Sequence, residues 1–366
     1  MRRVGVEEEL LLVDPESGHL RSVSAHVLHQ HRVASRNDAP ATDDLEGELL
    51  QHMVETHTDP LADLVEVDAQ IRAARRTAIA SARNAGVAVA ALGVAPLSPE
   101  RPRVTRNPRY ERIIEEFGDT GLAAGTLGMH VHVEVGDDEE GVRVIDGLRP
   151  WLPVLVALAA NSPYAEGRDT GYASWRQQVW SRWPTAGQAE PFGSAAGYGR
   201  ATEALIASGA ALDPGMLYFD ARLSVDYPTV EIRVADVCTD VDDAVLVAAM
   251  ARALVETVAG REDTDPVRSD LLRAAHWRAA RHGVSGTLLH PLTMRPVPAA
   301  EAVGALLDQV APALAASGDR PRVDASLARL RTLGGGARRQ RQAFERTGTA
   351  AGVVADVVAR TEEAAS

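Results

Sequence analysis

The sequence lacks lysine, has a single cysteine and contains no long apolar run, and each scarcity excludes a class of protein. All 38 basic residues are arginines, so permanent positive charge on side chains comes from guanidinium groups. Cys238 stands alone, which excludes disulfide bonds within the chain and zinc sites built from several cysteines. No stretch of about 18 apolar residues predicts a membrane span, and the glutamates at 7–9 interrupt any signal-peptide core. We therefore expect a soluble, cytoplasmic protein with no membrane partner.

The balance of charge argues against nucleic acid as a partner. Acidic residues number 51 against 38 basic ones, which gives a formal net charge of −13 at pH 7. An acidic surface without a basic block repels phosphate backbones. An anionic substrate would need local arginines or a metal ion to offset this negative field. With 366 residues, of which 45% are hydrophobic, the chain can form one large domain or two smaller ones.

Residues 4–13, VGVEEELLLV, predict a β-strand with carboxylates set into an apolar run. Because side chains alternate along a strand, Glu7 and Glu9 point to the same face, with their Cα atoms about 6.5 to 7 Å apart. Two neighbouring carboxylates in an apolar strand repel each other and resist desolvation, so something positive must lie over them. A pair of arginines or a divalent cation such as Mg²⁺ or Mn²⁺ would serve, and both are open at this point.

Residues 128–135, GMHVHVEV, predict a second strand in which apolar and ionisable residues alternate. His130, His132 and Glu134 share one face, and the other face is wholly apolar. A His-x-His pair on a strand aims two imidazoles at one point, as metal ligands do. A half-buried strand also commonly places its polar residues in water, so the pattern has two interpretations.

Two further segments carry ionisable residues in an apolar setting. The periodicity of residues 46–60 suits a helix and a strand equally, and in both cases Glu55 lies among apolar neighbours. Residues 217–233 predict a β-hairpin with its turn at 226–228. The ionisable residues of this hairpin alternate with apolar ones and are Asp220, Arg222, Glu231 and Arg233.

Most of the remaining chain predicts helices, with one further buried strand at 87–94. Prolines at positions 150 and 153 disturb one of these helices. The predicted helical segments are 61–85, 142–160, 242–259, 267–282, 299–316, 325–333 and 337–363.

Three irregular segments have two interpretations each. The loop at 161–187 contains Arg176 and three of the five tryptophans, which indicates either a functional loop or simple packing of its aromatic rings. The basic segment 101–112 either faces an anion or lies on the surface. The glycine-rich turn at 334–336 runs into Arg338 and Arg341, which suits either phosphate binding or a hinge.

The predicted strands share one apolar face and one ionisable face, which indicates an antiparallel sheet with helices behind its apolar side. A merely solvated face would carry lysine and threonine, but these positions hold mainly glutamate, histidine and arginine. Carboxylates with histidine form cation sites, and interleaved arginines bind anions through two parallel hydrogen bonds. The pattern therefore indicates a site for a metal–nucleotide complex and a carboxylate substrate.

The ordered set of segments resembles the carboxylate–amine ligases of the glutamate–cysteine ligase type 2 family, relatives of glutamine synthetase. The resemblance runs nearly end to end. It rests on VGVEEELLLVD at 4–14, VETHTDP at 54–60, GMHVHVEV at 128–135, NSPYAEGRDTGYASWRQQ at 161–178, WPTAG at 183–187, DARLSVDYPTVEIRVAD at 220–236, HWRAARHG at 276–283 and GGGARRQR at 334–341.

This resemblance implies an α+β fold of the glutamine synthetase type. A mainly antiparallel sheet would form an active-site face and α-helices would surround it, within a single carboxylate–amine ligase domain over 1–366. The catalytic sheet would lie mostly in 1–236 and a helical part in 237–366. The open sheet edge and the apolar C-terminal helices would permit a homodimer.

The implied activity is an ATP-dependent ligation of a carboxylate to an amine through an acyl phosphate, with Mg²⁺ or Mn²⁺. The expected substrates are the γ-carboxylate of L-glutamate and L-cysteine, giving γ-glutamylcysteine, ADP and phosphate. A different pair of carboxylate and amine, or a noncatalytic ATP-binding regulator of the same fold, are the alternatives. A metal-dependent amidohydrolase would instead place its His-x-His pair early in the chain.

The resemblance also implies roles for single residues. The metal-coordinating positions would be Glu7, Glu9, Glu55, His130 and Glu231. Arg233 would contact the transferred phosphate, and Arg222 and Arg176 would bind the substrate carboxylate or the nucleotide. Arg338 and Arg341 are the further candidates for nucleotide binding. His132 would support the metal ligands or contact the substrate, whereas Glu8 and Glu134 would be structural.

Overall fold

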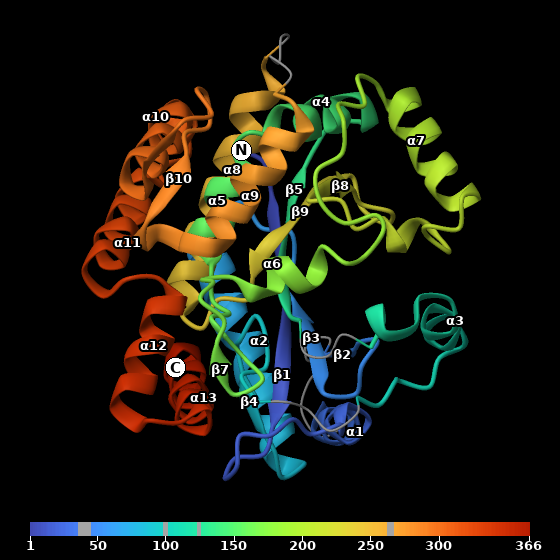
Figure 1. Ribbon diagram of the computed structural model, residues 1–366, viewed down its shortest axis with the longest axis vertical. Coiled ribbons are helices and arrows are strands. Elements are labelled where there is room, and N and C mark those ends of the chain that lie inside the picture. Colours follow the sequence, from blue (N-terminus) through green and yellow to red (C-terminus); the bar gives the residue numbers. More distant parts are fainter. Residues whose placement is uncertain (36–44, 98–101, 123–125, 262–266) are drawn as a thin grey trace.

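The main β-sheet is built around β1 (Val4–Val13), which has partner strands along both edges. The computed structural model describes residues 1–35, 45–97, 102–122, 126–261 and 267–366. All pairings in the sheet are antiparallel (Figure 1). Across the sheet the order is β2 (Glu46–Gly47), β3 (Met53–His57), β1, β5 (Gly128–Glu134), β9 (Thr229–Asp236) and β8 (Ala221–Leu223), and β4 (Ala88–Ala90) pairs with the end of β1.

The apolar face of the sheet is buried, as the alternation in the sequence predicts. Val4 and Val6 of β1 pack with apolar residues of β5 and β9 in the largest core of the protein. Leu10 and Leu12, further along β1, belong to a second core under β3 and β4. Glu7 and Glu9, which alternate with these residues, therefore present their side chains on the opposite face.

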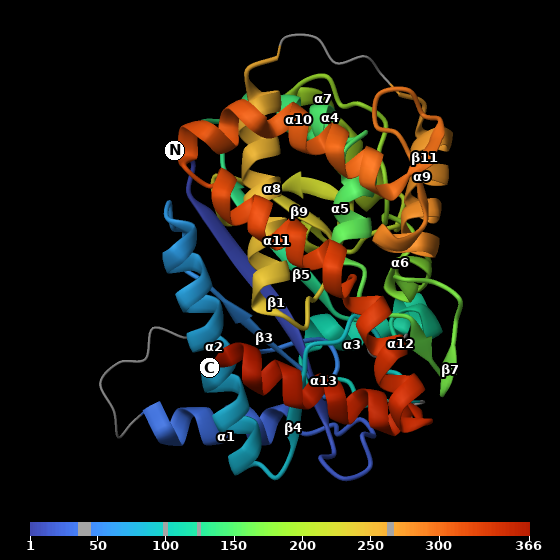
Figure 2. The same ribbon diagram turned by 90° about the vertical axis from the view of Figure 1, so that its left-hand side faces the viewer.

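Helices cover this apolar face, and α8 (Val241–Ala259) is the central one because most of its residues are buried. α2 (Leu64–Asn84), α4 (Asp138–Leu148) and α5 (Leu152–Ala159) contribute to the same core. The C-terminal helices complete this side of the molecule (Figure 2). They are α9 (Ser269–His282), α10 (Ala299–Ser317), α11 (Arg320–Leu333), α12 (Gly336–Thr347) and α13 (Ala350–Ala365).

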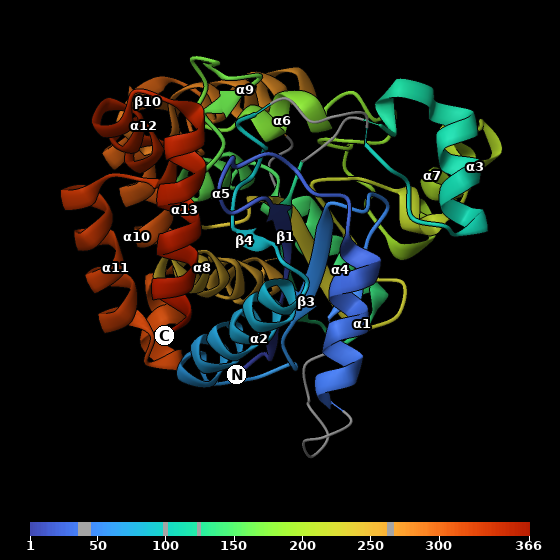
Figure 3. The same cartoon turned by 90° about the horizontal axis from the view of Figure 1, so that it is seen from below.

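Two helices lie on the other side of the strands, at the right in Figure 3. They are α3 (Pro108–Phe117) and α7 (Ala195–Ala207). Short elements connect the rest of the chain, namely α1 (Ser24–Ser35), α6 (Trp175–Trp180), the hairpin of β6 (Tyr164–Ala165) with β7 (Arg168–Asp169), and the hairpin of β10 (Thr287–Leu289) with β11 (Pro296–Pro298). The predicted α+β class, an antiparallel sheet backed by helices, is confirmed.

Proline and glycine divide two of the predicted helices. The segment 142–160 forms α4 and α5 with a break at 149–151, because Pro150 lacks the N–H donor of a continuous helix, whereas Pro153 lies in the first turn of α5, which needs no such donor. The segment 337–363 forms α12 and α13. Gly348 ends α12 in the left-handed conformation with φ of 72°, and the Thr349 hydroxyl accepts a hydrogen bond from the Gly352 N–H to begin α13.

Other boundaries also differ from the sequence prediction. The ambiguous segment 46–60 forms the strands β2 and β3, and the strand predicted at 87–94 is confined to β4. Inside the basic segment 101–112, Asn107 caps α3, which begins at Pro108, while Arg101 lies outside the described residues. α11 begins at Arg320, before the predicted 325. α3 thus lies partly in a segment that was predicted as irregular, and the first residue of each helix depends on caps that are only a few atoms in size.

α10 has the length and hydropathy of a membrane span, which was not expected from the sequence. Its Leu306, Val310 and Leu314 are nevertheless fully buried in the largest core, between α8 and α11, and Glu301 and Asp308 interrupt its exposed surface. One face of this helix is therefore covered by protein.

One carboxylate of β1 points away from the polar face and is neutralised in the core. Glu8 is 2% exposed, and the fully buried Arg75 of α2 donates hydrogen bonds to both of its oxygens at 2.8 and 2.6 Å. The same guanidinium donates to the backbone carbonyls of Cys238 and Thr239, each at 2.6 Å. The pair therefore joins β1 to α2 and to the segment that leads into α8.

The Glu8→Gln variant should lower the free energy of unfolding by about 3 kcal/mol, because Arg75 would keep a buried charge without a counter-charge. Urea denaturation at pH 7 measures this loss. Glu134→Gln is the matched control, since Glu134 pairs with Arg3 at the surface and its loss should cost far less. Equal losses in the two variants would contradict the assignment of Arg75 and Glu8 as a core pair.

Candidate active site

The polar face of the sheet borders a cavity of about 540 Å³. The antiparallel register gathers its ionisable residues there: Glu7 lies opposite His130, Glu9 opposite Glu55, and Glu231 opposite both His132 and Arg222. The pairing of β5 with β9 is irregular between Met129 and Val131, where β9 has one residue more than β5. The residues of the sheet that line the cavity are Glu7, Glu9, Met53, Glu55, His130, His132, Arg222, Glu231 and Arg233.

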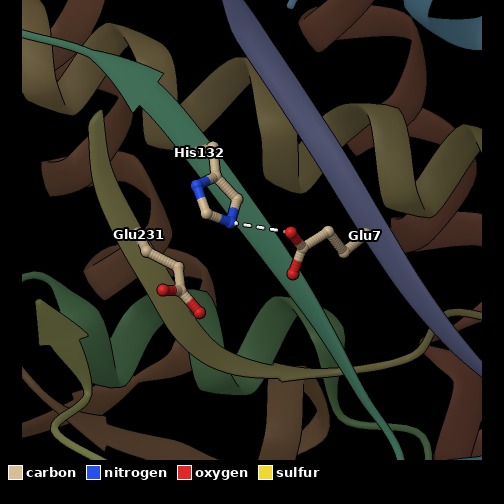
Figure 4. Close-up of side chains that lie close together, drawn as sticks. All are labelled: Glu7, His132 and Glu231. Atoms are coloured by element: carbon tan, nitrogen blue, oxygen red, sulfur yellow. Dashed lines mark ion pairs between the residues drawn. The ribbon is translucent and has the colours of Figure 1, made fainter. Parts of the chain in front are cut away.

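Two groups of side chains in this cavity could each hold a metal ion, and they share Glu7. In one group, ligand atoms of Glu7, Glu55 and His130 lie within 4.8 Å of one another. In the other, the same holds for Glu7, His132 and Glu231 (Figure 4). All five predicted metal positions thus line the cavity, four of them within these groups, and Glu9 lies beside Glu55. His132, which the sequence suggested only as a supporting residue, joins the second group.

The environment of Glu7 favours its ionised form. Burial alone would raise the pKa of Glu7, but contacts with Nδ1 of His130 and Nε2 of His132, each at 3.1 Å, hold it well below its usual range. Burial, and after it the charge of Arg233, lowers the pKa of His130 to about 3. His130 is therefore neutral at pH 7, and its buried Nε2 has no hydrogen-bond partner among the described residues. An anionic oxygen next to an unpartnered imidazole nitrogen fits a divalent cation.

Glu9 and Glu55 are crowded by other carboxylates. Burial and the nearby Glu48 raise the pKa of Glu9 to about 7, although the Gly128 N–H donates a hydrogen bond to its carboxylate. Burial, Glu48 and then the charges of Glu7 and Glu9 raise the pKa of Glu55 well above its ordinary value. No arginine forms an ion pair with Glu7 or Glu9 in the described parts of the chain. A cation between these carboxylates would remove their mutual repulsion.

Two arginines meet at Glu231. Arg222 Nε donates to one oxygen of this carboxylate at 2.7 Å, and Arg233 donates to the other. Burial, and after it the charge of Arg222, lowers the pKa of Arg233 to about 10, so it stays charged at neutral pH. Arg233 also lies over the ring of Tyr218, 5.9 Å from the centroid. The two guanidinium groups thus face the same cavity as the candidate metal ligands.

Arg176 lies behind the cavity and does not line it. Its side chain is 1% exposed and extends past Gly128, where a Cβ atom would collide with the guanidinium group. The guanidinium donates two long hydrogen bonds, each 3.4 Å, to the Arg233 carbonyl and lies 5.2 Å from the ring centroid of Trp180. It is nevertheless close enough to Glu9 to oppose the rise in the pKa of that carboxyl.

The structure does not bring Arg338 and Arg341 to the cavity. Arg341 pairs with Asp169 at 2.7 Å and donates to the Tyr172 carbonyl, and Arg338 borders a separate apolar groove beside α10 and α11. The glycine-rich turn before them serves packing instead, because Gly336 lies so close to Asn161 that a Cβ atom would collide with it. The same turn signature thus fits a helix–loop contact.

Several residues of the cavity were not predicted as site residues. Arg109 of the basic segment 101–112 lies in its wall, paired with Asp213 at 2.7 Å, and the anion-facing interpretation of this segment stays a prediction. Glu48, which precedes β3, lies beside Glu55, and its carboxylate was a visible signal in the segment 46–60. Nothing in the sequence distinguished Tyr110 or Tyr218. Trp180 and Trp183 of the predicted functional loop do line the cavity.

The fold is that of known ligases. The crystal structure of a glutamate–cysteine ligase from Francisella tularensis in complex with AMP superposes with a TM-score of 0.72 at 12% identity, covering 99% of this chain and 88% of that one. A bifunctional glutathione synthetase from Pasteurella multocida gives a TM-score of 0.69 at 15% identity, covering all of this chain and 52% of that one. At these identities the likeness shows the fold alone.

Sequence comparison shows the family. Residues 3–360 match the glutamate–cysteine ligase family 2. A Nocardioides protein named "Putative glutamate--cysteine ligase 2-1" is 53% identical over 375 residues, covering 99% of this chain and 96% of its own length. A Streptomyces coelicolor protein named "Putative glutamate--cysteine ligase 2" is 50% identical over 368 residues and covers both chains fully. The chain belongs to the glutamate–cysteine ligase family 2 and is an ATP-dependent ligase that forms carbon–nitrogen bonds.

In the absence of divalent cations, the contribution of Glu9 to stability should fall as the pH rises from about 4.5 to 7. Glu9 has a pKa of about 4.5 when unfolded and about 7 when folded, so its carboxyl binds more protons in the folded state in this window. The lowered pKa of His130 acts in the opposite direction, so the test compares the wild type with Glu9→Gln. Urea denaturation in EDTA at several pH values should show the free energy of unfolding of the wild type falling by about 1 to 3 kcal/mol relative to that of Glu9→Gln. A difference between the two proteins that stays the same at every pH would contradict the assigned proton.

Proposed function

We propose that this ligase uses ATP to convert a carboxylate into an acyl phosphate and then joins the acyl group to an amine. The observation that carries the proposal is a single cavity in which two candidate cation groups sharing Glu7 adjoin Arg222 and Arg233. Carboxylates with imidazole suit a magnesium–nucleotide complex, and guanidinium groups suit a phosphoryl group in transfer.

The proposed reaction has two steps. An oxygen of the substrate carboxylate attacks the γ-phosphorus of ATP, the bond from that phosphorus to the bridging oxygen breaks, and ADP leaves. The amine nitrogen then attacks the acyl carbon, phosphate leaves, and the nitrogen loses its proton. In the first step an anion must approach a polyanion, so the site has to supply positive charge where the two meet.

Glu7, Glu9, Glu55, His130 and Glu231 would hold Mg²⁺ or Mn²⁺, and His132 and Glu48 are placed to complete the set. When bound, the ions would screen the phosphate charge and polarise the transferred group. The fit rests on the donor set itself, since these are hard oxygen ligands with the neutral imidazole of His130 in a cavity that otherwise confines unbalanced negative charge.

The arginines would act on the anions directly. Arg233 is charged at neutral pH and faces the cavity, so we assign to it the stabilisation of the transferred phosphoryl group. Arg222 would bind the nucleotide or the substrate carboxylate. Both guanidinium groups contact the buried carboxylate of Glu231, which would otherwise lack a counter-charge. Arg176, behind Gly128, would contribute through its buried charge.

The γ-carboxylate of L-glutamate and the amine of L-cysteine are the proposed substrates, because the names of the relatives point to this pair. The product would be γ-glutamylcysteine. We propose that residues 1–366 act as a single domain in the cytoplasm. The edges of the sheet and the partly exposed apolar α10 would allow a homodimer.

ADP release should require Mg²⁺, a carboxylate and an amine together. We expect L-glutamate with L-cysteine to give the fastest release in a panel of amino acids, measured by a coupled assay with mass identification of the amide. Glu7→Gln should reduce turnover by about 100-fold or more, because it removes the ligand common to both cation groups.

The panel distinguishes the alternatives. A different productive pair would keep the mechanism and replace the substrates. Binding of ATP without turnover on any pair would instead support a regulator of the same fold.

Arg233→Met should lower kcat by about 10²- to 10³-fold while changing the KM for the amine little, because Arg233 acts on charge that develops during phosphoryl transfer. Arg320→Met is the matched control. Arg320 pairs with Asp324 on the surface of α11, far from the cavity, and its loss should leave kcat unchanged. A rise in the KM for ATP with an unchanged kcat would show that Arg233 only binds the ground state.

A further inference from the structure

The cavity of the candidate active site has two chemically different ends. Moving along β1 towards its N-terminus, Glu9 lies opposite Glu55, Glu7 lies opposite His130, and Gly5 lies opposite His132. The end at Glu9 is acidic, because Glu48 and Glu55 are there as well. The other end contains His132, Arg222 and residues 224–227 of the turn between β8 and β9, where Asp226 is the one carboxylate of the turn.

This difference orients a nucleotide. A polyphosphate is repelled by the acidic end and attracted by Arg222 and Arg233, whereas the acidic end suits the ammonium group of an amino acid. With its terminal phosphate at the metal ligands near Glu7, the rest of the nucleotide would extend away from Glu48 and Glu55. It would then pass His132 towards the turn between β8 and β9.

Two apolar side chains of this turn line the cavity but are largely uncovered. Val225 is 61% exposed and Tyr227 is 64% exposed. Three other rings of the cavity pack against one another, with Tyr218 4.9 Å from Trp180 and 5.1 Å from Trp183 between centroids. The ring of Tyr227 has one aromatic neighbour among the described residues, the edge-on imidazole of His132 at 6.3 Å. Packing of the protein therefore does not account for Tyr227.

The backbone holds the turn in place. The Ser224 N–H donates to the Thr229 carbonyl at 3.0 Å, and the Val135 N–H, beyond the end of β5, donates to the Pro228 carbonyl at 3.0 Å. The Thr229 hydroxyl also contacts Nδ1 of His132 at 3.0 Å. The turn is thus fixed to the strand that carries the candidate metal ligands, so Tyr227 and Val225 form a positioned surface at the mouth of the cavity.

We infer that Tyr227 and Val225 contact the base of the bound nucleotide, with the ring of Tyr227 stacking on it. This inference rests on the proposed use of ATP in this cavity and assigns the part of the site that recognises the nucleoside. A planar purine has the apolar area that would cover both side chains, and stacking on an aromatic ring requires no buried polar partner.

Comparison of two ligands isolates the base. Isothermal titration with Mg²⁺ present should show that Tyr227→Ala weakens the binding of ATP by about fivefold or more. The same variant should bind inorganic tripolyphosphate, which has the phosphates but no base, as the wild type does. Tyr227→Phe should retain the affinity for ATP, because the ring is kept. Leu292→Ala, which removes a side chain that is 63% exposed and does not line the cavity, is the matched control.

Three results would overturn the inference. An unchanged affinity of Tyr227→Ala for ATP would remove the base contact and leave the proposed function intact. Equal weakening of ATP and tripolyphosphate would show that the variant disturbs the phosphate site through the fold. A wild-type protein that binds neither ligand would overturn the proposed function together with this inference.

Discussion

The antiparallel pairing of β1 with β3 and β5 is the constraint on which the site depends. In this register Glu7 faces His130 and Glu9 faces Glu55, while Glu8 between them reaches Arg75 in the core. A slip by one residue would turn every side chain of β1 to the opposite face. It would place Glu7 and Glu9 among apolar helices and leave Arg75 without its counter-charge. The buried pair therefore helps to specify the register that assembles the site.

The cavity contains more acidic side chains than the arginines and histidines around it can neutralise. Arg222 and Arg233 are both committed to Glu231, and His130 is neutral at pH 7. The carboxylates nearer β3 therefore retain protons in the absence of a cation. Binding of cations and phosphates to such a site neutralises its charges. The free energy of this binding therefore adds to the stability of the folded protein.

The part of the site that lies on strands was predictable because alternation is a local property of the sequence. Glu7, His130 and Glu231 each occupy the ionisable face of a visible two-residue repeat, and antiparallel pairing then gathers them. The contributions of loops and turns were not predictable in this way. Arg109 and Tyr218 reach the cavity through the path of the chain around it, which no periodicity encodes.

The glycine-rich turn at 334–336 shows that a local sequence pattern does not identify a binding site. Its sequence, with arginines at the start of a helix, has the local features of a phosphate site. Whether phosphate or protein occupies such a turn depends on what lies opposite, and here Asn161 and Asp169 lie opposite. α2 and the helices after residue 237 were predictable for the same reason as the strands. Their breaks at single glycines and caps were not predictable, and α3 and α6 lie in segments that were predicted as irregular.

The position of β1 also affects how the chain reaches its folded state. β1 precedes its partner strands in the sequence, yet β5 begins at Gly128 and β9 ends at Asp236. The sheet therefore cannot be completed until the residues up to Asp236 have been synthesised, and until β5 has been made one edge of the apolar strand β1 lacks its partner. Such a high contact order predicts slow folding, and a nascent chain that stops before β9 would be a substrate for chaperones and a source of aggregation.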